Sequence, residues 1–257
     1  MVQRKAFIVY ICSLIIVEQI SLCRVSNVHQ DVVTQRKVFR KRGDQFKVTD
    51  QVYFDLSKDQ EPIGRIVIGL FGELAPKTVE NFKQIATVGI NGLTYSGTRI
   101  HRIIKRFMIQ GGDIVQNNGM GSLSIFGSTF EDENLETKFQ ISGLVAMANK
   151  GVDTNGCQFF ITTVPTPWLN GLHTIFGKVV EGQDFVHIIE HVSTDIDDHP
   201  THDIIIENSG LIETPKPFFI SDEPYDLWAW LRASAVPLSM SFSILALFHW
   251  MIKKIEM

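Results

Sequence analysis

The amino-acid sequence predicts a single mainly β domain, in which two helices cover a sheet of short antiparallel strands. From Val48 to Ile212 the chain repeats short apolar runs bounded by glycine, proline, aspartate or asparagine, a pattern typical of strands joined by turns. Two segments in this range carry a helical period instead. With 44% hydrophobic residues, the 257-residue chain can bury one sizeable core. These observations favour a closed barrel with helices over its ends, although periodicity alone leaves a β-sandwich open.

The first elements of the domain are a hairpin and a helix. Residues 50–56 and 65–72 have the pattern of two strands, and turn residues at 57–64 separate them. Pro76 then suits a first helical turn, and Gly89 suits the end of the helix. The apolar residues between these two recur at helical spacing, which predicts one buried face formed by Val79, Phe82, Ile85 and Ala86.

The second half of the domain continues the strand pattern and adds another helix. Short strands are expected at 100–115, 141–147, 158–164 and 174–180. A second short helix is predicted for 182–192, because apolar residues repeat there on one helical face. A last strand at 202–212 closes the domain near Ile212.

Both ends of the chain carry uncharged apolar runs. A basic start and small residues at a plausible cleavage point predict a signal peptide at 1–23. The uncharged stretch 233–252 is long enough to cross a membrane as a helix, and tryptophans and a following lysine pair suit its two interfaces. These features predict a single-pass protein of the endoplasmic reticulum or the secretory-pathway membrane, with its main domain in the lumen.

The remaining boundaries follow from these features. We expect a basic flexible leader at 24–47, a globular domain at 48–212, a linker at 213–232 and a cytoplasmic tail at 253–257. Lys41 and Arg42 in the leader are a candidate processing site, and a solvated run of charges is the alternative.

Composition and motifs argue against several classes of function. The net charge of −4 arises from interspersed signs, so no nucleic-acid partner is expected. Two of the three cysteines lie in the predicted signal peptide, which leaves Cys157 without an internal disulfide partner. The His- and Asp-rich stretch 191–203 lacks the glycine and glutamate of a calcium loop and the spacing of a zinc site, so we expect a solvated loop and no metal. Phosphate-loop and serine-nucleophile motifs are also missing, and no cofactor is expected.

Four motifs occur in the order found in one known family. They are "IHRIIKRFMIQGGD" at 100–113, "EDEN" at 131–134, "MANKGVDTNGCQFFIT" at 147–162 and "WLNGLHTIFGKVVEG" at 168–182. Together they resemble the cyclophilin family of peptidyl-prolyl cis-trans isomerases. The resemblance implies a closed eight-stranded antiparallel β-barrel capped by two α-helices, activity on proline-containing polypeptide clients without a cofactor, and binding of a cyclosporin-type inhibitor.

The resemblance also implies which residues form the site. The catalytic positions of the family fall on Arg102, Gln110 and Asn149, with the arginine as the essential donor. Lys150 stands where a small residue is common, and Val152 replaces a proline, departures that bear on substrate preference more than on activity. The implied substrate-binding positions are Phe107, Met108, Gly119, Ala148, Lys150, Gln158, Phe160, Trp168, Leu169 and His173.

Three functional classes remain open from the sequence. The first is an active isomerase tethered to the membrane, and the presence of Arg102 favours it. The second is a chaperone that holds clients in the same groove without turnover, and the third is a metal-dependent enzyme that uses 191–203. The whole chain, including the predicted anchor, is similar to the photoreceptor cyclophilins of flies, which implies rhodopsin as a client.

Overall fold

The computed structural model describes residues 45–221, together with residues 250 and 253. This part of the chain contains ten strands, two α-helices and one 3₁₀ turn. The helices are α2 (Pro76–Thr87) and α3 (Gln183–Glu190), and the 3₁₀ turn η1 is Pro167–Leu169. The strands are β1 (Gln45–Val48), β2 (Asp50–Lys58), β3 (Glu61–Leu70), β4 (Ile100–Ile104), β5 (Met108–Gly111), β6 (Leu144–Met147), β7 (Phe159–Thr162), β8 (Ile175–Glu181), β9 (Ile204–Ile212) and β10 (Phe218–Ser221).

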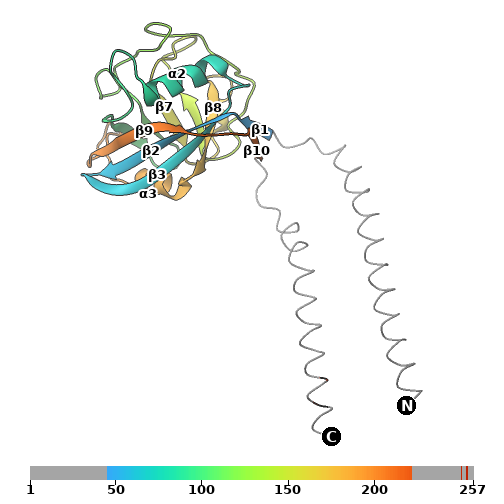
Figure 1. Cartoon of the computed structure of the whole chain (residues 1–257). Coiled ribbons are helices and arrows are strands. Elements are labelled where there is room, and N and C mark those ends of the chain that lie inside the picture. Colours follow the sequence, from blue (N-terminus) through green and yellow to red (C-terminus); the bar gives the residue numbers. More distant parts are fainter. Residues whose placement is uncertain (1–44, 222–249, 251–252, 254–257) are drawn as a thin grey trace. The chain divides into compact units, whose positions relative to one another are not determined.

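Eight of the strands form one antiparallel sheet that curls into a nearly closed barrel. Its order is β4-β5-β7-β6-β8-β3-β2-β9. The two edge strands meet where Arg99 bridges Ile205, and the N–H of Gly97 donates to the carbonyl of Ile206 over 2.7 Å. In Figure 1, α2 and α3 lie at opposite ends of this barrel. The predicted eight-stranded antiparallel barrel with two helices is therefore confirmed, although a single bridge joins its edges instead of a complete strand pair.

The interior of the barrel is filled by aromatic and branched side chains. The rings of Phe54 and Phe159 stack at 5.5 Å, and Phe82 of α2 lies 4.9 Å from Phe176. Because a fully buried aliphatic or aromatic side chain contributes about 1.5–3 kcal/mol, this cluster is a main source of stability. The predicted buried face of α2 is confirmed for all four residues, Val79, Phe82, Ile85 and Ala86.

The first hairpin is tighter than the sequence suggests. Strands β2 and β3 run on through most of the predicted turn at 57–64, and only Asp59 and Gln60 remain between them. Both residues have positive φ, 50° and 71°, as the two central residues of a type I′ hairpin turn require. Ser57 and Lys58 have turn-like side chains, but their backbones pair with Pro62 and Glu61 across the hairpin.

A second, two-stranded sheet extends the fold beyond the expected limits of 48–212. Strand β1 pairs with β10, and the ring of Phe46 stacks on Phe71 at 4.8 Å. The end of the predicted leader and part of the predicted linker are thus strands. Local sequence could not reveal this, since β1 and β10 lie at opposite ends of the domain.

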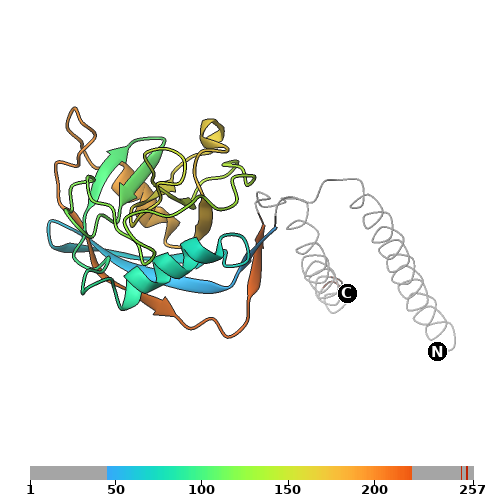
Figure 2. The same ribbon diagram turned by 90° about the horizontal axis from the view of Figure 1, so that it is seen from above.

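Several predicted segments lie outside the described residues. They are the signal peptide 1–23, the leader up to residue 44, the linker from 222, and all of the anchor 233–252 and the tail 253–257 except Trp250 and Lys253. In the part of the chain that the structure describes, no helix has the length and apolar character needed to cross a membrane. Figure 2 shows the described domain from above.

Candidate active site

The alternation of side chains along β4, β5, β7 and β6 separates the core from a candidate site on the outer face. Ile103, Ile109, Ile161 and Val145 belong to the core cluster inside the barrel. The intervening residues point to the other face, as the period of a strand requires. Four of these residues are direct cross-strand partners in one continuous row, namely Arg102, Gln110, Phe160 and Ala146.

The polar half of the site is a chain of amide groups. The side-chain amide of Gln110 donates to Oε1 of Gln158 over 2.9 Å. Gln158 is buried and donates in turn to the carbonyls of Gly119 and Gly121, at 2.9 and 2.7 Å. Because buried amide groups are costly to leave unpaired, these hydrogen bonds fix the side chain of Gln110 on its strand. They also hold the loop that carries Gly119 and Gly121, called the glycine loop, against that strand.

The carboxylate of Asp113 organises that loop from inside. It accepts five backbone N–H bonds, from Val115, Gln116, Asn118, Gly119 and Gly121. Burial raises the pKa of Asp113, but the backbone donors together outweigh burial and lower the pKa to about 2. Gly119 has φ of 89°, a conformation that favours glycine, so the loop brings backbone close to the row of site residues.

The apolar half of the site belongs to a second hydrophobic cluster on the outer face. Met108 and Phe160 are buried in this cluster, and Phe107, Ala148 and Leu169 pack against it. The ring of Trp168 lies 5.7 Å from that of Phe107, and it is 59% exposed. An aromatic side chain this exposed beside a partly buried apolar surface is typical of a binding surface.

Helix α3 holds the turn that presents Phe107. The carboxylate of Glu190 accepts the N–H of Arg106 at 2.5 Å and the hydroxyl of Thr163 at 2.8 Å. Burial raises the pKa of Glu190, but hydrogen bonds from His187, Thr163 and the Arg106 backbone outweigh burial and lower the pKa. Arg106 has φ of 57°, so this tight turn returns the chain from β4 to β5 within three residues.

The opposite wall of the site comes from the loops after β6 and η1. The amide of Asn149 donates to the carbonyl of Leu172 over 2.9 Å, and Nδ1 of His173 donates to the carbonyl of Met147 over 3.0 Å. Burial lowers the pKa of His173 and favours the neutral imidazole. The ring of His173 meets Phe160 edge-on at 5.1 Å, which joins this wall to the row.

A recess of about 190 Å³ lies between the glycine loop and the loop after β6. Gly119 and Gly121 line one side, and Ala148, Asn149 and Lys150 line the other. Gln110 and Gln158 also line it. The recess is therefore continuous with the polar half of the site.

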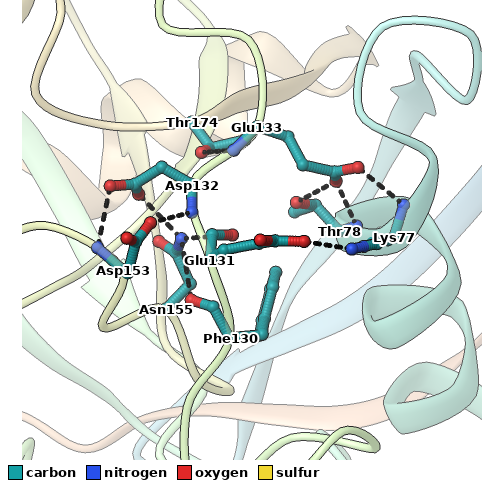
Figure 3. Close-up of polar contacts among 9 residues, drawn as sticks. All are labelled: Lys77, Thr78, Phe130, Glu131, Asp132, Glu133, Asp153, Asn155 and Thr174. Carbon is teal, nitrogen blue, oxygen red and sulfur yellow. Dashed lines mark hydrogen bonds and ion pairs between the residues drawn. The ribbon is translucent and has the colours of Figure 1, made fainter.

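The "EDEN" segment is bonded to Asp153 and Asn155, which follow Lys150 in the loop after β6 (Figure 3). Asp132 and Asp153 exchange backbone N–H bonds to each other's carboxylates, at 2.8 and 3.0 Å. Asn155 adds a side-chain bond to Asp132 at 2.8 Å. The segment thus holds the chain between Lys150 and Gln158 in place without itself lining the recess.

The same segment caps helix α2, whose own N-cap residue, Ala75, has no side-chain cap. Oε2 of Glu133 accepts the N–H of Thr78 at 2.7 Å and its hydroxyl at 2.8 Å. Oε1 accepts the N–H of Lys77 at 3.1 Å, and Figure 3 shows all three contacts. A carboxylate at a helix N-terminus satisfies unpaired N–H groups and suits the helix dipole.

The structure brings all thirteen predicted site residues to this outer face and the loops beside it. It also places a residue that the sequence did not indicate: Asp198, in the stretch expected to be a solvated loop, accepts hydrogen bonds from Arg102. No local signal could have found this contact, because 96 positions separate the two residues.

Among the described residues, the site offers hydrogen-bond donors and an apolar surface instead of an activated nucleophile. Cys157 is buried, and burial raises the pKa of its thiol, so the reactive thiolate is disfavoured. Arg102, with its side chain 44% exposed, presents a charged donor in the same row as Gln110 and Phe160. Such an arrangement can bind a peptide segment and stabilise a changed charge distribution without forming a covalent bond.

Comparisons with known proteins agree with this geometry. The family model for "Cyclophilin type peptidyl-prolyl cis-trans isomerase/CLD" matches residues 53–211. A relative from Calliphora vicina, "Peptidyl-prolyl cis-trans isomerase, rhodopsin-specific isozyme", is 49% identical over 84% of this chain and 92% of its own length. Peptidyl-prolyl cis-trans isomerase D of Saccharomyces cerevisiae is 49% identical over 65% of this chain and 75% of its own.

A further relative, peptidyl-prolyl cis-trans isomerase B of Saccharomyces cerevisiae, is 46% identical over 63% of this chain and 80% of its own. The family match covers more than half of the chain and includes all or most of each strand of the barrel. The chain therefore belongs to the cyclophilin family and is a peptidyl-prolyl cis-trans isomerase.

Proposed function

We propose that this chain is a membrane-anchored isomerase and folding chaperone of the secretory pathway, which assists a membrane-protein client such as rhodopsin. The predicted signal peptide and anchor support the location, and the name of the Calliphora relative supports the client. The isomerase domain faces the lumen, where it meets nascent clients before they leave the endoplasmic reticulum.

The observation that carries the catalytic part of the proposal is the row from Arg102 through Gln110 to Phe160. Neighbouring strands lie about 4.8 Å apart, so the backbones of Arg102 and Phe160, two strands apart, are separated by about 10 Å. A proline residue fits between them, with its ring toward Phe160 and its nitrogen toward the guanidinium. Gln110 stands between the two in the row, which supports a role for its amide in orienting the bound peptide.

The chemistry is rotation about a bond with partial double-bond character, and the barrier is about 18–20 kcal/mol. As the bond twists, the prolyl nitrogen loses its resonance and becomes a better hydrogen-bond acceptor. Arg102 donates to this nitrogen more strongly in the twisted state than in the planar one, and such a difference lowers a barrier. An arginine suits the role because it stays charged and presents several donors in a fixed plane.

The other site residues bind the peptide. We assign the proline pocket to Phe107, Met108, Phe160 and Leu169, and orientation of the flanking backbone to Gln110 and Asn149. A cyclosporin-type inhibitor is expected to compete for this surface. The remaining peptide contacts are assigned to Gly119, Ala148, Lys150, Gln158, Trp168 and His173.

A second candidate function is a chaperone that holds clients without turnover. The exposed ring of Trp168 beside the apolar pocket favours it, because this surface can retain a proline-containing segment whether or not rotation is accelerated. The two functions share their binding residues and differ in their need for Arg102.

Both proposals can be tested in cells that lack their own photoreceptor isomerase and express rhodopsin. The full-length chain is compared with Arg102→Ala, with a form that stops after Ser221, and with Arg65→Ala as a control. Arg65 is an exposed arginine on β3 that pairs with Asp55, so its loss matches the change in charge. Delivery of rhodopsin to the cell surface is measured.

We expect the full-length chain and Arg65→Ala to deliver rhodopsin, and Arg102→Ala and the shortened form to fail. Equal delivery by Arg102→Ala would favour the holding chaperone. Delivery by the shortened form would argue against a required anchor. Isomerase activity on a model peptide is measured in parallel for each protein. If the full-length chain is active on the peptide and all four proteins still fail to deliver rhodopsin, rhodopsin is excluded as the client.

A further inference from the structure

The loop between α3 and β9 is fastened to the edge strand β4 on both sides of Arg102. The N–H of Ile103 donates to the carbonyl of Asp198 over 2.9 Å. Nδ1 of His199 donates to the carbonyl of His101 over 2.8 Å. Because β4 is an edge strand of the sheet, these bonds occupy backbone groups that no neighbouring strand pairs.

Within this loop the conformation of Asp198 is closely specified. Its φ is 65°, in the left-handed region, where aspartate and asparagine are tolerated better than most side chains. Asp195 supports it, because its carboxylate accepts the N–H groups of Asp197 and His199 at 3.0 and 2.9 Å. The carboxylate of Asp198 is therefore presented from a turn with its own internal bonds.

That carboxylate reaches one edge of the Arg102 guanidinium. Nε and Nη2 of Arg102 lie 3.3 and 3.1 Å from Oδ2 of Asp198. Among the described residues Nη1 has no hydrogen-bond partner, so this edge of the guanidinium stays available. An unrestrained arginine side chain populates many rotamers, and one fixed edge removes most of them.

We propose that Asp198 is a positioning residue for the isomerase, which orients the Arg102 guanidinium so that Nη1 points to the prolyl nitrogen. The inference rests on the proposed catalytic role of Arg102. Asp198 itself does not touch the substrate. It holds one edge of the arginine while the opposite edge donates to the twisting bond, so its loss lowers the rate of rotation and leaves peptide affinity unchanged.

The test compares three variants of the full-length chain in a peptide isomerisation assay. Asp198→Gly removes the carboxylate and still permits φ of 65°, whereas Asp198→Asn keeps an acceptor oxygen at the same place. Asp197→Asn is the matched control, since it removes one charge from the same loop, whereas the hydrogen bonds and ion pair of Arg102 within the described part of the chain go to Asp198. For each variant kcat, KM and the NMR signal of the Arg102 Nε–H are measured.

We expect kcat to fall about fivefold in Asp198→Gly with KM unchanged, the size expected for an exposed ion pair. The Nε–H signal should broaden in this variant. Asp198→Asn should retain most of kcat and a sharp signal, and Asp197→Asn should behave as the unmodified chain.

Three results would overturn the inference. They are an unchanged or raised kcat in Asp198→Gly, an Asp198→Asn variant as impaired as the glycine variant, or a loss that falls on KM instead of kcat. Arg102→Ala separates this inference from the proposed function. If Arg102→Ala is fully active, the role of the arginine itself is wrong, and if only Asp198→Gly is fully active, the positioning role alone is wrong.

Discussion

Arg102 on β4 lies directly opposite Gln110 on β5, and both side chains stand on the outer face of the barrel. Gln110 is in turn opposite Phe160 on β7. Directly opposed residues have Cβ atoms about 4.5–5.5 Å apart, so a charged donor, an amide and an aromatic ring follow one another across three strands. This row predicts which substitutions affect catalysis and which affect only the framework.

Replacing Arg102 by alanine should lower kcat by about 10²–10³-fold, the loss typical for removal of one donor that acts on the transition state. Peptide affinity should change little, because the apolar pocket and the amide groups remain. The measurement is a cis-to-trans assay of a short X-Pro peptide with the full-length chain, and circular dichroism reports the fold. Arg65→Ala, on β3, is the control. A tenfold weaker peptide affinity with unchanged kcat would assign Arg102 to binding instead.

The row also shows how far the sequence alone can predict this site. The alternation in 100–113 separates Ile103 and Ile109, which face inward, from Arg102 and Gln110, which face outward. The period of a strand determines this separation locally. The pairing of β5 with β7, which places Phe160 beside Gln110, depends on the order of strands in the sheet. Only the family resemblance, and not periodicity, anticipated that these residues meet.

Other features could not be predicted because their partners are distant in the sequence. Asp198 meets Arg102 through a loop whose composition suggests only solvation. Glu133 caps α2 from 55 residues away, and the first turn of the helix has no acidic residue of its own that would mark its start. The exact position of the two-residue turn at Asp59 and Gln60 is hidden for another reason. The polar residues at the end of β2 have the composition of a turn, although their backbones pair as a strand.

Low pH should lower the free energy of unfolding of the domain, because it protonates the carboxylate of Asp113. Its folded pKa of about 2 lies below its ordinary value of 3.8, so the contribution of this carboxylate to stability is present above pH 3.8. This contribution is lost as the pH falls from about 4 toward 2. Nearly two pKa units correspond to roughly 2 kcal/mol at neutral pH. Asp113→Asn should therefore lower the free energy of unfolding by about this amount at pH 7, and by much less at pH 2.5.

Urea titrations of the unmodified chain and Asp113→Asn at pH 7, 4 and 2.5 measure the difference. Asp197→Asn is the control for the loss of one carboxylate, because only the backbone N–H of Asp197 takes part in a hydrogen bond among the described residues. A difference between the unmodified chain and Asp113→Asn that is the same at all three pH values would show that the loss is steric and unrelated to the charge.

Glu133→Ala should destabilise the domain by about 1–2 kcal/mol, because α2 would lose its cap and leave the N–H groups of Lys77 and Thr78 unpaired. Glu131→Ala is a closely matched control in the same segment (Figure 3). Glu131 forms an exposed ion pair with Lys77, and such a pair contributes only about 0–1 kcal/mol. Thermal and urea unfolding of both variants should rank them in this order. Equal losses would mean that the carboxylate of Glu133 does not act as a cap.

Lys150 should give the site a preference for acidic peptides. Its side chain is exposed at the recess beside Gly119 and Ala148, and among the described residues its ammonium has no acidic partner. A peptide series with Glu, Gln or Lys next to the X-Pro pair should therefore show affinity in that order, with about two- to fivefold between the extremes at low salt. Because exposed charges are screened over about 10 Å at 0.1 M salt, the differences in affinity between the three peptides should shrink as salt is added.

Lys150→Ala should abolish the preference without lowering kcat for the Gln peptide. Lys216→Ala, between β9 and β10, should retain the preference. If Lys150→Ala and Lys216→Ala weaken the preference equally, the net charge of the domain and not the rim of the recess selects the peptide.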